Sequence, residues 1–208
     1  MDYKLVKRVS DINFIKMAKP GDVILSTLDI SLNIKKLHRR IYRDLLLTVQ
    51  HSPFSSSKMY VGKNMVVGYG AIPNTTVKMS INNFYSFKNS QKRLILLRPD
   101  FLTYGEIQKS VSFMLSRLDV DYNFKLLMET LLNRIFKKLH IKSSLYKDDE
   151  NKYNILLKNI QPLICSNIIA LSYYKASVKT KYIFDIFNVW PKDFYNSYNM
   201  KKVCYYER

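Results

Sequence analysis

The sequence has little cysteine, with only Cys165 and Cys204 among its 208 residues. Two cysteines build no disulfide framework, and neither stands in the CxxC or Cys/His spacing of a zinc site. The sequence therefore predicts no metal and no cofactor. We also expect the protein in a reducing compartment. It also lacks an apolar run long enough to cross a bilayer, and the N-terminus lacks the apolar region of a signal peptide. We therefore expect a cytoplasmic protein without a transmembrane segment.

Acidic residues are scarce as well, because 16 Asp and Glu stand against 34 Lys and Arg, which gives a net charge of +18. Such an excess can steer a protein toward nucleic acid or another anionic surface. The basic residues are spread along the chain, and the one dense cluster includes Lys36, Arg39, Arg40 and Arg43. Coding bias is the alternative, because Lys, Asn, Ile, Tyr and Phe are all abundant. No recognised nucleic-acid module accompanies the charge.

The chain shows no internal repeat and no interdomain linker, so residues 1–208 are expected to form a single α+β domain. Strands are predicted after the turn at Pro20 and Gly21, and at Lys58–Gly62, Met65–Tyr69 and Arg93–Arg98. Helices are predicted at Ile34–Leu47 and at Lys125–His140. A third helix is predicted to start at the capping box formed by Thr103 and Glu106. Ser143–Lys152 is polar and indicates a surface loop, so residues 125–160 are interpreted as a helical insertion and a surface loop.

The segment most informative for function is Pro162–Leu171, an apolar run that contains Cys165. Proline favours the start of a helix, so Cys165 is expected in the first turn. There the unpaired amide N–H groups and the helix dipole favour a negatively charged sulfur. Cys165 is therefore a candidate nucleophile. The alternative is a small hydrophobic residue in a core helix, which is the usual role of a free cysteine.

Four short segments follow one another in an order that matches a known family. They are Lys19–Leu25 with Gly21 and Asp22, Val120–Phe124 with Tyr122, Ile164–Ile169 with Cys165 and Ser166, and Trp190–Tyr195. This order resembles the permuted papain-like cysteine hydrolases of the NlpC superfamily, in particular the YiiX-like branch, which includes poxvirus proteins. The resemblance implies a small antiparallel sheet or partial barrel packed against helices, with the nucleophile helix near the C-terminus. It also implies a viral or phage protein, in the host cytoplasm or the virion.

The resemblance assigns catalytic roles that this sequence fills only in part. The family's histidine base corresponds to Ser56 in the ungapped segment Ser52–Gly62, and serine cannot accept a thiol proton at neutral pH. The family's acidic residue falls near Gly68 and Tyr69, where there is no carboxylate. His51, five residues before Ser56, is the candidate base, and a surface histidine is its alternative. Either His51 replaces the base, or the domain is catalytically silent, or Ser56 is an altered residue.

Three further positions have two interpretations each. The Tyr122 hydroxyl would face an oxyanion or the catalytic pair, or it would anchor two helices. Ser166 and Asp22 are assigned as oxyanion or structural residues.

The first functional hypothesis is a cysteine hydrolase or acyltransferase that acts on an amide or ester of a peptide, peptidoglycan or lipid acyl substrate. A silent papain-like domain with a viral structural or binding role is the second hypothesis, and charge-driven nucleic-acid binding is the third.

Overall fold

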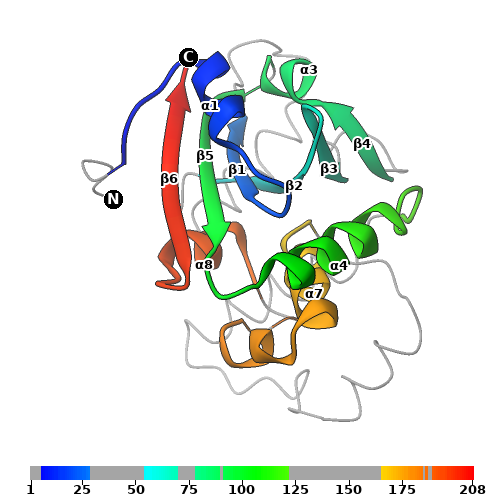
Figure 1. Ribbon diagram of the computed structural model, residues 1–208. Helices are drawn as coiled ribbons and strands as arrows, with labels where there is room; N and C mark the ends of the chain where they lie inside the picture. Colours follow the sequence, from blue (N-terminus) through cyan, green and yellow to red (C-terminus); the bar gives the residue numbers. More distant parts are fainter. Residues whose placement is uncertain are drawn as a thin grey trace, which may run out of the picture.

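The structure is a computed structural model that describes residues 6–28, 54–69, 78–89, 91–121, 165–184, 186 and 189–208. These residues form an antiparallel sheet of six strands, in the order β4-β3-β2-β1-β5-β6, together with helices (Figure 1). The strands are β1 (Val23–Leu28), β2 (Ser56–Gly62), β3 (Met65–Tyr69), β4 (Met79–Asn83), β5 (Gln91–Pro99) and β6 (Met200–Glu207). The expected α+β class is confirmed.

Two local sequence signals account for two of the connections. Lys63 and Asn64 join β2 to β3 with positive φ angles of 51° and 58°, the conformation of a two-residue hairpin turn. Thr103 begins α4 (Tyr104–Leu115), and its hydroxyl accepts from the Glu106 amide while Glu106 accepts from the Thr103 amide. Both the hairpin and the capping box were predicted.

Helices cover both faces of the sheet. One face carries α4, α7 (Cys165–Ala176), η1 (Val178–Tyr182) and α8 (Pro191–Asn196). The other face carries α1 (Asp11–Met17) and α3 (Phe84–Lys88). We call these the α7 face and the α1 face. No described helix is long and apolar enough to span a membrane.

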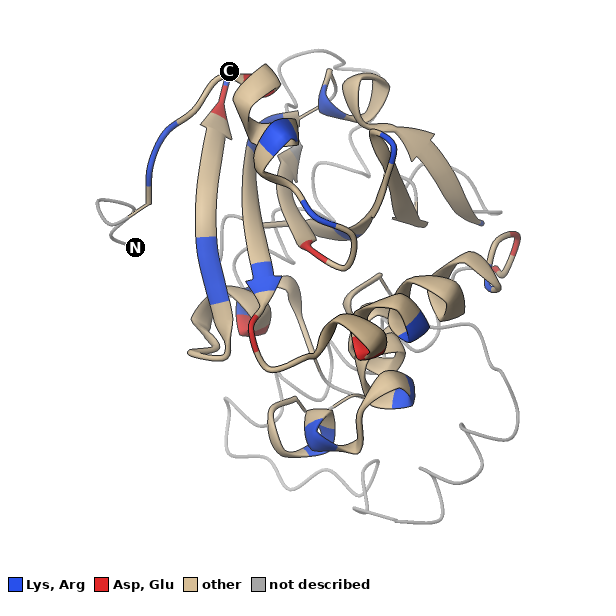
Figure 2. Cartoon of the chain, in the orientation of Figure 1, with Lys and Arg blue, Asp and Glu red and all other residues tan. Residues whose placement is uncertain are grey.

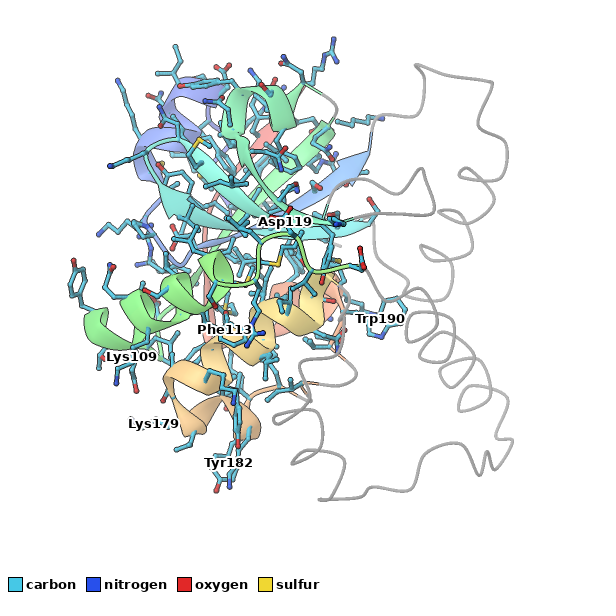
Figure 3. All side chains as sticks on the ribbon, turned by 90° about the vertical axis from the view of Figure 1, so that its right-hand side faces the viewer. Lys109, Phe113, Asp119, Lys179, Tyr182 and Trp190 are labelled. Carbon is cyan, nitrogen blue, oxygen red and sulfur yellow. The ribbon has the colours of Figure 1, made fainter. Side chains whose placement is uncertain are left out.

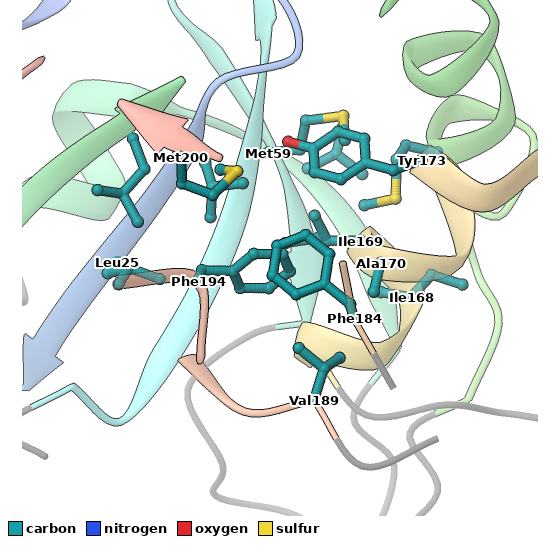
Figure 4. Close-up of a cluster of buried hydrophobic side chains, with 14 of the residues drawn as sticks. Leu25, Met59, Ile168, Ile169, Ala170, Tyr173, Phe184, Val189, Phe194 and Met200 are labelled. Atoms are coloured by element: carbon teal, nitrogen blue, oxygen red, sulfur yellow. The ribbon is translucent and has the colours of Figure 1, made fainter. Parts of the chain in front are cut away.

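Strand alternation divides the buried side chains between two clusters. Val23, Leu25 and Met59 point to the α7 face, where they pack with Ile168 and Ile169 of α7 (Figure 4). The neighbouring strand residues point to the α1 face, and they include Ile24, Tyr60, Val66, Leu94 and Leu96. The predicted place of Cys165 in the first turn of a helix is confirmed, and that helix packs on β1 and β2.

The N-terminal segment lies along the outer edge of β6. The Val9 amide donates to the Tyr205 carbonyl at 2.9 Å, and the Tyr205 amide donates to the Lys7 carbonyl at 3.0 Å. Arg8 and Tyr205 form a parallel bridge. These contacts place the first described residues beside the last strand.

Candidate active site

Cys165 is the first residue of α7, and its side chain is half-buried against the core of the α7 face. The first amide N–H groups of a helix have no partner within the helix. A sulfur at this position lies close to those donors and to the positive end of the helix dipole. The helix packs against β2, so the central part of the sheet supports the thiol.

The next two residues of α7 fasten the chain that follows η1. The Ser166 hydroxyl donates to the Val189 carbonyl at 2.7 Å, and the Asn167 side-chain amide donates to the Ile186 carbonyl at 2.5 Å. Both side chains are fully buried. For Ser166 this contact favours the structural interpretation over the oxyanion one. Ser166 and Asn167 hold the start of α7 at a fixed place in the core.

β2 presents Ser57 to the α7 face. Ser57 shares this face with Met59, whereas Ser56 shares the α1 face with Lys58 and Tyr60. The resemblance assigns Ser56 to the family's histidine position, but the strand directs Ser56 away from α7. Ser57 is 1% exposed, and its hydroxyl has no partner among the described residues. The polar side chain of β2 on the α7 face is therefore Ser57.

Lys58 is a buried lysine, which the sequence analysis did not single out. Its ammonium donates to the Tyr69 carbonyl at 2.9 Å and to the Gly68 carbonyl at 3.4 Å, and it lies 5.3 Å from the centre of the Phe87 ring. No described carboxylate forms an ion pair with it. Burial lowers the pKa of Lys58 to about 8, and the negative charge of a Cys165 thiolate would raise it.

Gly68 provides the space for Lys58. A Cβ at Gly68 would lie 3.0 Å from the Lys58 Cγ, so a larger residue would meet the lysine stem. Gly68 and Tyr69 are the segment where the resemblance places an acidic residue. The structure instead shows their carbonyl groups accepting hydrogen bonds from a lysine. A lysine directly before the apolar residues Met59, Tyr60 and Val61 of a predicted strand was the available sequence signal.

The carboxylate of Asp22 is buried and bound by neighbouring side-chain and main-chain donors. It accepts two hydrogen bonds from Arg98, at 2.9 and 2.8 Å, and one from the Lys19 amide at 2.9 Å. Asp22 is 1% exposed, and burial raises its pKa although the Arg98 hydrogen bonds lower it. These bonds hold the turn before β1 to β5. They favour the structural interpretation of Asp22.

Tyr173 anchors α7 to the same turn. Its hydroxyl donates to the Gly21 carbonyl at 2.6 Å, and burial raises its pKa well above the usual tyrosine value. Tyr173 thus has the helix-anchoring role that was one interpretation of Tyr122. Tyr122 itself, His51, and the basic residues Lys36, Arg39, Arg40 and Arg43 lie outside the described residues, as does the predicted insertion at 125–160.

Cys204 differs from Cys165 in burial and in its place in the fold. It is fully buried in β6 on the α1 face, and burial raises its pKa to about 12. In the described part of the chain, no three His, Cys, Asp or Glu side chains form a group that could hold a metal ion. Cys165 is therefore the candidate reactive thiol.

Comparison of the sequence with protein-family models and with curated proteins finds no match. The resemblance to the papain-like hydrolases thus depends on the order of the short segments and on the geometry around Cys165.

Proposed function

We propose that this protein is a cysteine hydrolase or acyltransferase of the permuted papain-like type, with Cys165 as its nucleophile. The observation that carries the proposal is the position of Cys165, half-buried at the first residue of a helix that packs on a central strand. The substrate class is an amide or ester whose carbonyl carbon the thiolate can attack.

A second observation comes from the strand beneath the helix. The hydroxyl of Ser57 is buried on the α7 face without a partner in the described part of the chain. The Ser26 and Thr180 hydroxyls are also buried without a partner in the described part of the chain, so it is the position of Ser57 on the face that carries α7 that makes it relevant here. The hydroxyl can donate a hydrogen bond to a bound substrate or a water molecule, although it cannot act as the base.

His51 is the candidate base in this proposal. Phe54, three residues after it, is fully buried on the α7 face and lies 5.4 Å from the Tyr195 ring, centre to centre. Three residues of extended chain span about 10 Å. The chain therefore enters β2 from the side of the sheet that carries Cys165, and the nearness of His51 to Phe54 in the sequence supports His51 as the base.

The proposed chemistry has two steps. His51 takes the proton of the Cys165 thiol, and the thiolate sulfur attacks the carbonyl carbon to form a carbon–sulfur bond and an oxyanion. The oxyanion collapses and expels an amine or alcohol, which takes the proton from His51. Water then attacks the thioester and releases a carboxylic acid and the thiol. With an amine or alcohol in place of water, the second step is acyl transfer.

A catalytically silent domain is the second candidate, and the character of Ser57 favours it. Ser57 is the described polar residue of β2 that faces α7, and a serine hydroxyl cannot accept a thiol proton at neutral pH. A silent domain would keep the fold and the buried contacts of Ser166 and Asn167, and it would lose only the proton transfer. The two candidates differ in the reactivity of Cys165.

The test uses p-nitrophenyl acetate as the acyl donor and mass spectrometry of the intact protein. We expect an acetyl group to form on Cys165 and to be released by water, and we expect His51→Ala to slow both steps by about tenfold or more. His38→Ala is the matched control and should change neither step. Acetylation of Cys165 that is slow and equal in wild type and His51→Ala would establish the silent domain.

A further inference from the structure

A corner of the helical layer combines exposed lysines with exposed apolar side chains. We call the surface formed by Lys175, Val178, Lys179, Lys181 and Tyr182 the η1 surface. Val178 is 67% exposed and Tyr182 is 80% exposed, and all three lysines are exposed. Lys179 and Tyr182 project from the outer end of this layer (Figure 3).

The geometry of η1 separates its buried and exposed edges. A 3₁₀-helix has three residues per turn, so its side chains form three edges. Thr180 is fully buried and forms the inner edge. One outer edge carries Val178 and Lys181, and the other carries Lys179 and Tyr182. Each outer edge thus pairs one cation with one apolar or aromatic side chain.

Lysines outnumber acidic residues at this corner. The described residues 165–184 contain three lysines and no Asp or Glu (Figure 2). Glu106 of α4 adjoins the corner, and its pKa is lowered first by the hydrogen bond from the Thr103 amide and then by Ser177 and the nearby Lys179. Its carboxylate is engaged by the Thr103 amide at 2.8 Å and the Thr103 hydroxyl at 3.0 Å. The carboxylate thus closes the capping box of α4.

We infer that the η1 surface is a docking site for an anionic phospholipid bilayer. Lysines pair with headgroup phosphates, while tyrosine and valine enter the boundary between headgroups and acyl chains. Nucleic acid would use the lysines and stack a base on Tyr182, but it gives no role to an exposed valine beside them. The alternation of cationic and apolar side chains on both outer edges therefore favours a bilayer.

The test is co-sedimentation of the full chain with vesicles of phosphatidylcholine and phosphatidylserine, and with vesicles of phosphatidylcholine alone. The η1 variant combines Val178→Ser, Lys179→Gln, Lys181→Gln and Tyr182→Ser. Its matched control combines Ile12→Ser, Lys16→Gln, Tyr198→Ser and Lys201→Gln, which removes the same chemical groups from exposed positions elsewhere. Because every changed side chain is exposed, both variants should unfold at the temperature of the wild type.

We expect the wild type and the control to bind the anionic vesicles alike, and the η1 variant to bind about tenfold more weakly. Equal weakening in the two variants would overturn the inference, because net charge alone would then explain binding. A single-stranded RNA oligonucleotide is the second ligand. Loss of RNA binding in the η1 variant, with vesicle binding unchanged, would assign the surface to nucleic acid and would also overturn the inference.

Discussion

The two faces of the sheet each carry a cysteine and a buried polar side chain, and the two cysteines differ in exposure. On the α7 face, the half-buried Cys165 lies at a helix start, and Ser57 presents a hydroxyl without a described partner. On the α1 face, Lys58 is closed in by two carbonyl groups and an aromatic ring, and Cys204 is fully buried. The α7 face thus leaves the thiol of Cys165 partly exposed, while the α1 face buries both Lys58 and Cys204.

The largest expected effect concerns the turn that anchors α7. Gly21 has a φ of +89°, and a Cβ there would lie 2.7 Å from the Ile107 Cγ2 of α4. Gly21→Ala should therefore lower the free energy of unfolding by about 3 kcal/mol, from backbone strain and the clash together. The measurement is urea unfolding followed by circular dichroism.

Gly62→Ala is the matched control for this change. Gly62 has a φ of +95°, but the nearest atom to an added Cβ is the Pro20 Cγ at 3.5 Å. The control should cost about 1 kcal/mol, which is the backbone term alone. An equal loss of unfolding free energy in the two variants would show that the clash with Ile107 costs nothing. The turn would then not be packed tightly against α4.

The next effect tests how well the α1 face is sealed. The pKa of Lys58 falls from 10.5 to about 8 on folding, so between these values the unfolded chain binds more protons than the folded one. Stability from this group therefore rises with pH across that window. Relative to Lys58→Met, wild type should gain about 3 kcal/mol at most between pH 8 and 10.5.

The measurement is the free energy of unfolding of each protein at several pH values, taken as a difference. Tyr173 and Cys204 also titrate at high pH, but their contributions are common to both proteins and cancel. Lys63→Met is the control, because it removes one lysine charge from an exposed position in the hairpin turn. A flat difference for Lys58→Met would mean that water reaches Lys58 and that the α1 face is open there.

The smallest expected effect is a change in the reactivity of Cys165 when a histidine is placed on one face of β2 or on the other. Ser57→His should place an imidazole on the α7 face and speed alkylation of Cys165 by iodoacetamide at pH 7 about tenfold. Ser56→His should place it on the α1 face and leave the rate unchanged. Labelling of the buried Cys204 reports unfolding in either variant. Faster labelling of Cys165 in Ser56→His alone would show that Ser56 is the vacated base position and that β2 turns the other way.

The sequence predicted those parts of the fold that depend on neighbours in the chain. The β2–β3 hairpin follows from the two turn residues between adjacent strands, and α4 follows from the capping box of Thr103 and Glu106. The strand β4 was not predicted, because Met79–Asn83 is a polar edge strand with a single buried residue. β6 was not predicted either, since its partner β5 lies more than a hundred positions earlier.

For the candidate site, the sequence indicated Cys165 but could not fix what surrounds it. Three consecutive serines, Ser55 to Ser57, carry no hydrophobic signal, so only the pairing with β1 shows which of them faces α7. The burial of Lys58 depends on the absence of a side chain at Gly68, on another strand. Propensity and periodicity do not report such contacts between strands.

The place of β6 in the sheet has a consequence for how the chain folds during synthesis. β6 leaves the ribosome after the other five described strands, yet it covers the edge of β5, whose residues Leu94–Leu97 are buried. Until the eight residues of β6 are made, this edge of β5 has no neighbouring strand. Unpaired strand edges of this kind are sites of aggregation. Because β6 pairs with a distant strand and then receives the N-terminal segment, closure of the sheet is a late and slow event. Nascent chains truncated before Met200 are therefore the form of this protein most dependent on chaperones.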